Sequence, residues 1–268
     1  IGHAPQAALI SPDKGSVLSI AEALTNISGA LLKKGLKSVS LSANWMWPCR
    51  VKGEDAALYK AVKACSDFAC ALGINIPTGK DSLSMSQKYG EKRVDAPGTV
   101  IISAAGEAYD IHNVVRPVVK NKKSRLLYID MSRDGLKLGG SAFAQSLGCI
   151  GKEAPTVTDP AYFAKTFNVI QKLNEQGLAA AQHDVSAGGL FTTLLEMTFA
   201  NTRGGLKINL DAFDESDIIK ILFAENPAVV IQVEEKNMKL AHELLYENSI
   251  DYKVIGEPVA ERIMEIEK

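Results

Sequence analysis

Residues able to do phosphate and metal chemistry gather in segment 77–85, where Gly79, Lys80, Asp81 and Ser82 follow one another. A glycine lets backbone N–H groups approach an anion, a lysine supplies positive charge, an aspartate binds a hard metal ion, and a serine donates to an oxygen. The segment is not a Walker A loop, because Ile74 stands where that motif needs its first glycine. A tight turn with a solvated Lys80–Asp81 pair is the alternative interpretation.

Two oxygen-bearing side chains lie four residues apart in a predicted helix. The apolar spacing of segment 17–34 predicts this helix, with Ser16 as its N-cap and Gly35 as its stop. Glu22 and Asn26 leave it on one face, one turn apart, and together can bind one Mg²⁺. An ordinary polar pair on an amphipathic helix is the alternative.

A third set lies in the predicted loop 183–189, between an apolar strand and a helix. Asp184 can complete a metal site, and Ser186 can bind a phosphate oxygen near the start of the helix. A capping role for either residue needs no ligand and is the alternative. The glycine-containing segment 138–141 poses the same choice between an anion site and a tight connection.

Helix-like and strand-like patterns alternate along the chain and must position these residues. The predicted strand 37–44 ends at Asn44, a position where α/β proteins often present ligand-contacting groups. Pro117 and a basic run interrupt the pattern near 116–124, so we predict two α/β or α+β domains, residues 1–118 and 119–268. Further predicted helices are 54–72, 190–200, 236–248 and one starting at Pro160; further predicted strands are 99–109, 126–129, 178–181, 206–210, 228–233, 252–255 and two around Tyr89-Gly90.

Composition limits the function classes. The 268 residues are 46% hydrophobic, enough for a substantial core, and the net charge of −1 gives no reason to expect nucleic acid or an anionic membrane as partner. No apolar run approaches the roughly 20 residues of a membrane span. Four cysteines without metal-site spacing predict reduced thiols in a cytoplasmic protein. The start at Ile1, without methionine, predicts a piece of a longer protein.

Taken in order, these motifs resemble the large phosphoribosylformylglycinamidine synthases of purine biosynthesis, and the resemblance extends over nearly the whole chain. It corresponds to the second half of the synthetase core, a unit similar to aminoimidazole ribonucleotide synthetase. The implied fold is an α+β domain, here truncated at its start, whose strands pair with those of a counterpart half. An α/β domain follows it. The segments that carry the resemblance are 21–26, 41–46, 53–55, 77–85 and 183–190.

The resemblance implies an ATP-dependent carbon–nitrogen ligase that uses glutamine as amido donor. ATP phosphorylates the amide oxygen of formylglycinamide ribonucleotide, and ammonia displaces the phosphate to give the amidine. The implied partners are the first half of the synthetase core and a glutaminase domain of the same protein, so the isolated chain is expected to be inactive. A noncatalytic ADP/Mg²⁺-binding scaffold and another ATP-using enzyme of the same superfold, such as a kinase, are the alternatives.

The resemblance also implies two sites. In a structural nucleotide site, Mg²⁺ is bound by Glu22, Asn26 and Asp184, and Ser186 contacts ADP or ATP. In the working site, Lys80 and Asp81 are catalytic, and substrate or ATP is contacted by Asn44, Gly79 and Ser82.

The chain departs from the family pattern at two places. Shorter relatives have Gly-Asn-x-Ser where this chain has a lysine and an aspartate after Gly79, which weakens the working-site assignment. Many relatives have an aspartate where this chain has Ala187, so any role of that carboxylate is in doubt here.

Overall fold

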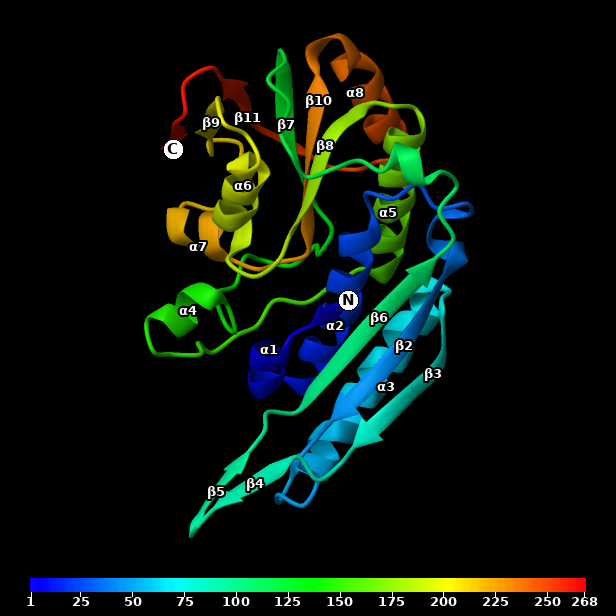
Figure 1. Cartoon of the computed structure of the whole chain (residues 1–268), viewed down its shortest axis with the longest axis vertical. Helices are drawn as coiled ribbons and strands as arrows, with labels where there is room; N and C mark the ends of the chain where they lie inside the picture. The colour runs from blue at the N-terminus through cyan, green and yellow to red at the C-terminus, as the bar shows by residue number, and fades with distance from the viewer.

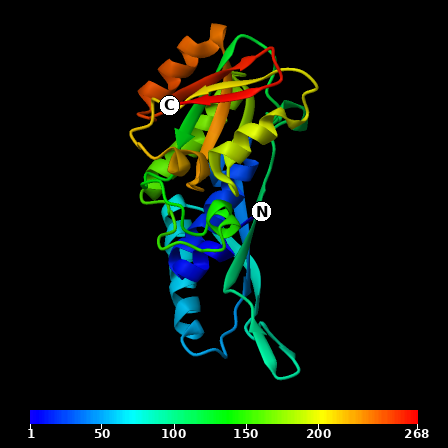
Figure 2. The same cartoon turned by 90° about the vertical axis from the view of Figure 1, so that its left-hand side faces the viewer.

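Two sheets organise the chain in the computed structural model, which describes residues 1–268 (Figure 1). Neighbouring strands of the first sheet are, in order, β1 (Gly2–His3), β6 (Thr99–Gly106), β2 (Val39–Met46) and β3 (Asn75–Ser82). The second has the order β12 (Met264–Glu267), β9 (Gly205–Asn209), β11 (Lys253–Val259), β7 (Ser124–Asp130), β10 (Ala228–Glu234) and β8 (Ala179–Val185). The hairpin of β4 (Ser86–Tyr89) and β5 (Lys92–Asp95) projects beyond the body of the molecule (Figure 2).

Helices cover one face of the first sheet and both faces of the second. Helices α2 (Pro12–Ile27) and α3 (Glu54–Leu72) lie side by side behind β6, β2 and β3, and α1 (Pro5–Ile10) packs on α2 (Figure 1). The remaining helices are α4 (Ala142–Ser146), α5 (Pro160–Glu175), α6 (Gly189–Phe199), α7 (Ile218–Phe223) and α8 (Met238–Glu247); short 3₁₀ turns cover Gly35–Ser38, Ile111–Asn113 and Glu235–Asn237.

The alternating pattern of β2 sets which side chains face the helices. Val39, Leu41 and Ala43 are buried in the core, whereas the alternate residues Ser40, Ser42 and Asn44 point to the face that no helix covers. The prediction of a half-buried strand is confirmed, and the open face is the one that can meet a ligand or another chain.

The second sheet separates two apolar layers by the same alternation. Leu127 and Ile129 of β7 pack in the larger core cluster with α5 and α8, while Leu126 and Tyr128 pack in the second cluster with α6 and α7. The larger cluster also contains α2, α3 and the first sheet, so one continuous core joins the two sheets. The predicted mixture of α+β and α/β architecture is confirmed as two mixed sheets with packed helices.

Some predicted boundaries are wrong. The first long helix is α2, which starts at Pro12 rather than at residue 17 and ends at Ile27. Ser16 lies inside it, and its hydroxyl donates to the carbonyl of Pro12 instead of capping a helix start. Pro12 can open the helix because the first helical position needs no donated N–H bond. The segment around Gly79 is strand β3 rather than a loop, because β2 supplies its hydrogen-bond partner.

The first sheet uses residues between 2 and 106 and the second uses residues between 124 and 267. A domain boundary between residues 118 and 119 stays a prediction. No helix combines the length and apolar character that crossing a membrane requires.

Candidate functional site

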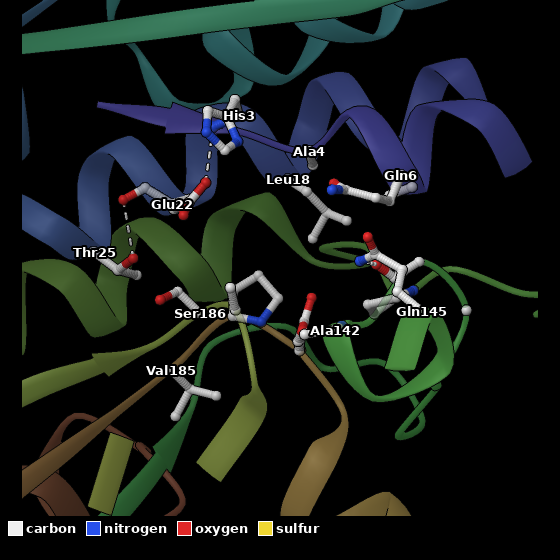
Figure 3. Close-up of a pocket in the computed structure, with 17 residues that line it drawn as sticks. His3, Ala4, Gln6, Leu18, Glu22, Thr25, Ala142, Gln145, Val185 and Ser186 are labelled. Carbon is white, nitrogen blue, oxygen red and sulfur yellow. Dashed lines mark hydrogen bonds between the residues drawn. The ribbon is translucent and has the colours of Figure 1, made fainter. Parts of the chain in front are cut away.

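A cavity of about 130 Å³ opens where α1 and α2 face the loops at one end of the second sheet (Figure 3). Its wall combines residues from distant parts of the sequence, among them His3, Glu22, Gly140, Ser186 and Glu225. The cavity therefore depends on the packing of α2 against the C-terminal part of the chain.

Glu22 lines this cavity, and Asp184 lies near enough for its charge to act on Glu22. Glu22 Oε2 accepts a hydrogen bond of 2.8 Å from the backbone N–H of His3, and Asp184 Oδ2 accepts one of 3.3 Å from the hydroxyl of Thr25, also on α2. Burial is the main reason why the pKa of Glu22 lies above its ordinary value; the His3 hydrogen bond opposes this shift and the charge of Asp184 adds to it. Carboxylate oxygens are ligands that Mg²⁺ prefers, so both residues are candidates to bind it.

Asp184 and Ser186 do not cap the helix that follows them. Asp184 is the buried penultimate residue of β8, and the N-cap of α6 is Gly188, which has no side-chain capping bond. Ser186 lines the cavity, and its side chain points toward Glu22 and Thr25 in Figure 3. The capping alternative is thus not what the structure shows, and a ligand-contacting role fits both residues.

Asn26 is less well placed than its neighbour on α2. Its Nδ2 donates to the carbonyls of Ile1 and Glu22, the residue is exposed, and it does not line the cavity. Glu22 and Ser186 thus line the cavity and Asp184 is hydrogen-bonded to Thr25 of its wall, whereas Asn26 lies one turn away on α2. No group of three or more His, Cys, Asp or Glu side chains is arranged to hold a metal ion.

The glycine-containing segment 138–141 is a tight connection. The N–H of Gly139 donates to Glu153 and that of Gly140 donates to Ile150, so neither is free to bind an anion. A Cβ at Gly139 would lie 2.1 Å from the Glu153 carbonyl oxygen, which explains the glycine by packing alone.

The ring of His183 contacts the carboxylates of both Asp184 and Glu196. His183 Nδ1 lies 3.2 Å from Asp184 Oδ1, and its Nε2 lies 3.0 Å from Glu196 Oε2 of α6. Burial lowers the pKa of His183, but the two carboxylates outweigh burial and the net shift is upward.

The second group of candidate residues lies on the open face of the first sheet. Asn44 of β2 is the register partner of Lys80 in β3, so both side chains leave the sheet on the same side. Lys80 Nζ donates to the hydroxyl of Ser82 at 2.7 Å. Asn44 Oδ1 is buried and has no hydrogen-bond partner in the protein, which marks a place for an incoming donor.

Two other members of the 77–85 segment are separated from this group. Asp81 pairs in register with Trp45, so it leaves β3 on the opposite face from Lys80. A Cβ at Gly79 would lie 2.2 Å from the carbonyl oxygen of Ala43, so the close approach of β2 alone explains this glycine.

Sequence reasoning missed several residues of the cavity wall: His3, Gln6, Gln145 and Glu225. Glu225 carried one usable signal, since it is a carboxylate just before the fully apolar start of β10. The others stand in segments without a chemical motif, and only the fold brings them to the cavity.

Family models match both parts of the chain. Residues 1–107 match the FGAR-AT PurM_N-like domain, and residues 125–267 match the C-terminal domain of AIR synthase related proteins.

Curated relatives carry the name phosphoribosylformylglycinamidine synthase. The Homo sapiens protein is 39% identical over 240 residues, which cover 89% of this chain and 18% of the relative. The Arabidopsis thaliana protein, named as a probable chloroplastic/mitochondrial form, is 36% identical over 269 residues, covering 99% of this chain and 19% of the relative. The chain thus spans about a fifth of the length of these relatives.

Solved structures show the same fold at low sequence identity. T. maritima PurL complexed with FGAR has a TM-score of 0.78 at 15% identity, covering 99% of this chain and 42% of that one. E. coli HypE, a hydrogenase maturation protein, has a TM-score of 0.61 at 18% identity, covering 92% of this chain and 75% of that one. Because its C-terminal model match covers more than half of the residues, the chain belongs to the AIR synthase related family.

Proposed function

We propose that this chain is the second half of the synthetase core of a phosphoribosylformylglycinamidine synthase. The observation that carries the proposal is that Glu22 and Ser186 line one cavity and Asp184 is hydrogen-bonded to Thr25 of the same wall, in a chain that is 39% identical to a human protein of that name. ATP would phosphorylate the amide oxygen of formylglycinamide ribonucleotide, and ammonia would displace phosphate to form the amidine.

The cavity is the better candidate for a bound Mg²⁺–nucleotide with a structural role. Glu22 and Asp184 would bind the metal ion with help from Asn26, and Ser186 would contact the nucleotide. The metal ion would neutralise phosphate charge there. PurL structures complexed with ATP and with ADP show that proteins of this fold bind such nucleotides.

The open sheet face is the candidate for the working site. Lys80 and Ser82 would bind phosphate oxygens, and Asn44 would contact substrate or ATP with its unpaired oxygen. We assign Gly79 a backbone role in the same site. We assign Asp81 a metal-binding role; because its side chain leaves β3 on the face opposite Lys80, the ligand would have to extend to that face as well. The counterpart half and a glutaminase domain of the same protein would complete the site and supply ammonia.

Product analysis on the full-length protein that contains this chain tests the proposal. With formylglycinamide ribonucleotide, ATP, Mg²⁺ and glutamine, we expect equal amounts of amidine, ADP and phosphate. A phosphorylated ester without amidine would support a kinase of the same fold, and bound ADP without any turnover would support a noncatalytic scaffold.

A further inference from the structure

Glu225 joins two distant loops through a single oxygen atom. It lies between α7 and β10, and its Oε1 accepts hydrogen bonds of 2.7 Å from the backbone N–H of Ala142 and 2.7 Å from that of Gly188. These donors come from the start of α4 and from the loop that carries Ser186. One carboxylate therefore fixes both loops at the rim of the cavity.

Both donors are groups that need an acceptor. The first N–H groups of a helix have no acceptor within the helix, and Ala142 is the first residue of α4. Gly188 is the N-cap of α6, so its N–H must also find an acceptor outside that helix. Hydrogen bonds from such N–H groups to a carboxylate are strengthened by its charge and by the positive end of the helix. Burial raises the pKa of Glu225, these two hydrogen bonds oppose that shift, and the nearby charge of Glu22 adds to it.

The next residue, Asn226, holds the beginning of the segment that leads to Ala142. It is fully buried, its Nδ2 donates to Ser132 Oγ at 3.2 Å and to the Gly135 carbonyl at 3.1 Å, and its Oδ1 accepts from Lys137 N–H at 3.3 Å. Two consecutive residues thus hold segment 132–142 at both ends, with Gly139 and Gly140 of the cavity wall between them.

We propose that Glu225 is a positioning residue of the cavity. By accepting from Ala142 and Gly188, it holds the Ser186 loop opposite Glu22 so that a nucleotide phosphate and its metal ion meet these side chains in one geometry. The inference deepens the proposed nucleotide site and rests on it. It assigns Glu225 no contact with the ligand itself, so the acceptor oxygen matters most and the negative charge acts only by strengthening the two hydrogen bonds.

Two substitutions separate these roles in the full-length protein. Glu225→Gln keeps a carbonyl oxygen that can accept both N–H groups, whereas Glu225→Ala removes the acceptor. We expect the alanine variant to raise the dissociation constant for Mg²⁺–ADP at least about tenfold and the glutamine variant to stay within about threefold of wild type, as read by titration calorimetry on protein from which bound nucleotide has been removed. Glu243→Ala, an exposed position on α8, is the matched control.

Each other outcome overturns the inference in a recognisable way. A lower melting temperature with an unchanged dissociation constant assigns Glu225 to stability alone, and equal loss in the glutamine and alanine variants means that the charge itself binds. If Glu225→Ala does not fold, Glu225→Asp withdraws the oxygen instead and is expected to bind as weakly. A wild-type protein that neither carries ADP when purified nor binds Mg²⁺–ADP once freed of nucleotide removes the proposed nucleotide site and this role with it, whereas binding unaffected by any variant removes only this role.

Discussion

Lys80 is an exposed cation whose only hydrogen bond is local, to Ser82. If it stabilises a phosphoryl group during transfer, Lys80→Ala in the full-length protein should lower turnover by about a hundredfold or more. The melting temperature should barely change, because an exposed charge contributes little to stability. Steady-state kinetics and a thermal melt on the same preparation test both parts.

Lys88→Ala is the matched control for this substitution, because Lys88 is an exposed strand lysine in the projecting hairpin. Turnover of the control should stay near wild type. A normal kcat for Lys80→Ala would remove the lysine from the working site, and a collapsed melt would show that its effect is on folding.

Glu22 of α2 and Asp184 of β8 carry oxygen atoms suited to Mg²⁺, and Asp184 is hydrogen-bonded to Thr25, which lies on the same helix as Glu22. We expect Glu22→Ala and Asp184→Ala to remove tightly held Mg²⁺–ADP from the purified full-length protein and to lower its melting temperature, since a bound ligand stabilises the fold. Nucleotide quantified after denaturation measures the effect, with exposed Asp67→Ala on α3 as control. Stoichiometric ADP in both variants would contradict the assignment.

At the scale of residues, the sequence predicted part of the cavity wall. The resemblance placed Glu22, Asp184 and Ser186 in one site; in the structure Glu22 and Ser186 line the cavity, and Asp184 is hydrogen-bonded to Thr25 of its wall. Glu225 could not be placed there from sequence, because its two donors lie 83 and 37 residues away and meet it only through the sheet topology.

Strand β3 depends on a glycine for its close pairing with β2. A methyl group at position 79 would lie 2.2 Å from the Ala43 carbonyl oxygen. We expect Gly79→Ala to cost about 1–3 kcal/mol of unfolding free energy because the strands must move apart, and turnover should fall as Lys80 and Ser82 shift with them. Gly135→Ala is the control, because a Cβ there meets nothing within 4 Å. Equal denaturation midpoints for the two variants would contradict the packing explanation.

The end of β10 is tied to the basic segment before β7. Hydrogen bonds from Lys122 and then Lys236 hold the pKa of Glu234 at about 2, below its ordinary value of 4.5. Since the folded pKa is the lower one, this interaction stabilises the fold fully above pH 4.5 and is lost as the pH falls toward 2. Lys122→Met should therefore destabilise the protein near pH 6 and make progressively less difference below pH 4.5. Chemical denaturation of wild type and variant at pH 6 and below pH 4.5 tests this. A difference in unfolding free energy that does not depend on pH would point to lost packing instead.

At the scale of elements, local patterns located most helices and strands but not their exact ends. The apolar spacing that suggested a helix to residue 34 continues past Ile27 because Leu32 and Leu36 pack in the core, and their N–H groups donate to Gln171 and Asn168 of α5. The 77–85 segment has turn-forming residues, yet pairing with β2 makes it a strand. Both differences come from tertiary contacts that no local pattern contains.

At the scale of the whole molecule, the two sheets share one core while one sheet face stays open. The larger apolar cluster contains Leu41 of the first sheet, Phe163 of α5 and Val229 of the second. On the open face, the side-chain oxygen of Asn44 has no hydrogen-bond partner. Shared packing favours cooperative folding of the chain, whereas the open face favours a site completed by another part of a longer protein.

We therefore expect the isolated 268-residue chain to fold but to have no synthase activity. Both tryptophans, Trp45 and Trp47, lie in or next to β2, so their fluorescence reports the first sheet, while circular dichroism reports every helix and strand. The fluorescence and circular dichroism signals should change in one common unfolding transition, which would show that the sample is folded. That sample, given formylglycinamide ribonucleotide, ATP, Mg²⁺ and ammonium, should form no amidine, although the full-length protein does under the same conditions. Measurable amidine formation by the isolated chain would contradict the proposal that Lys80 and Asn44 form only one part of the working site.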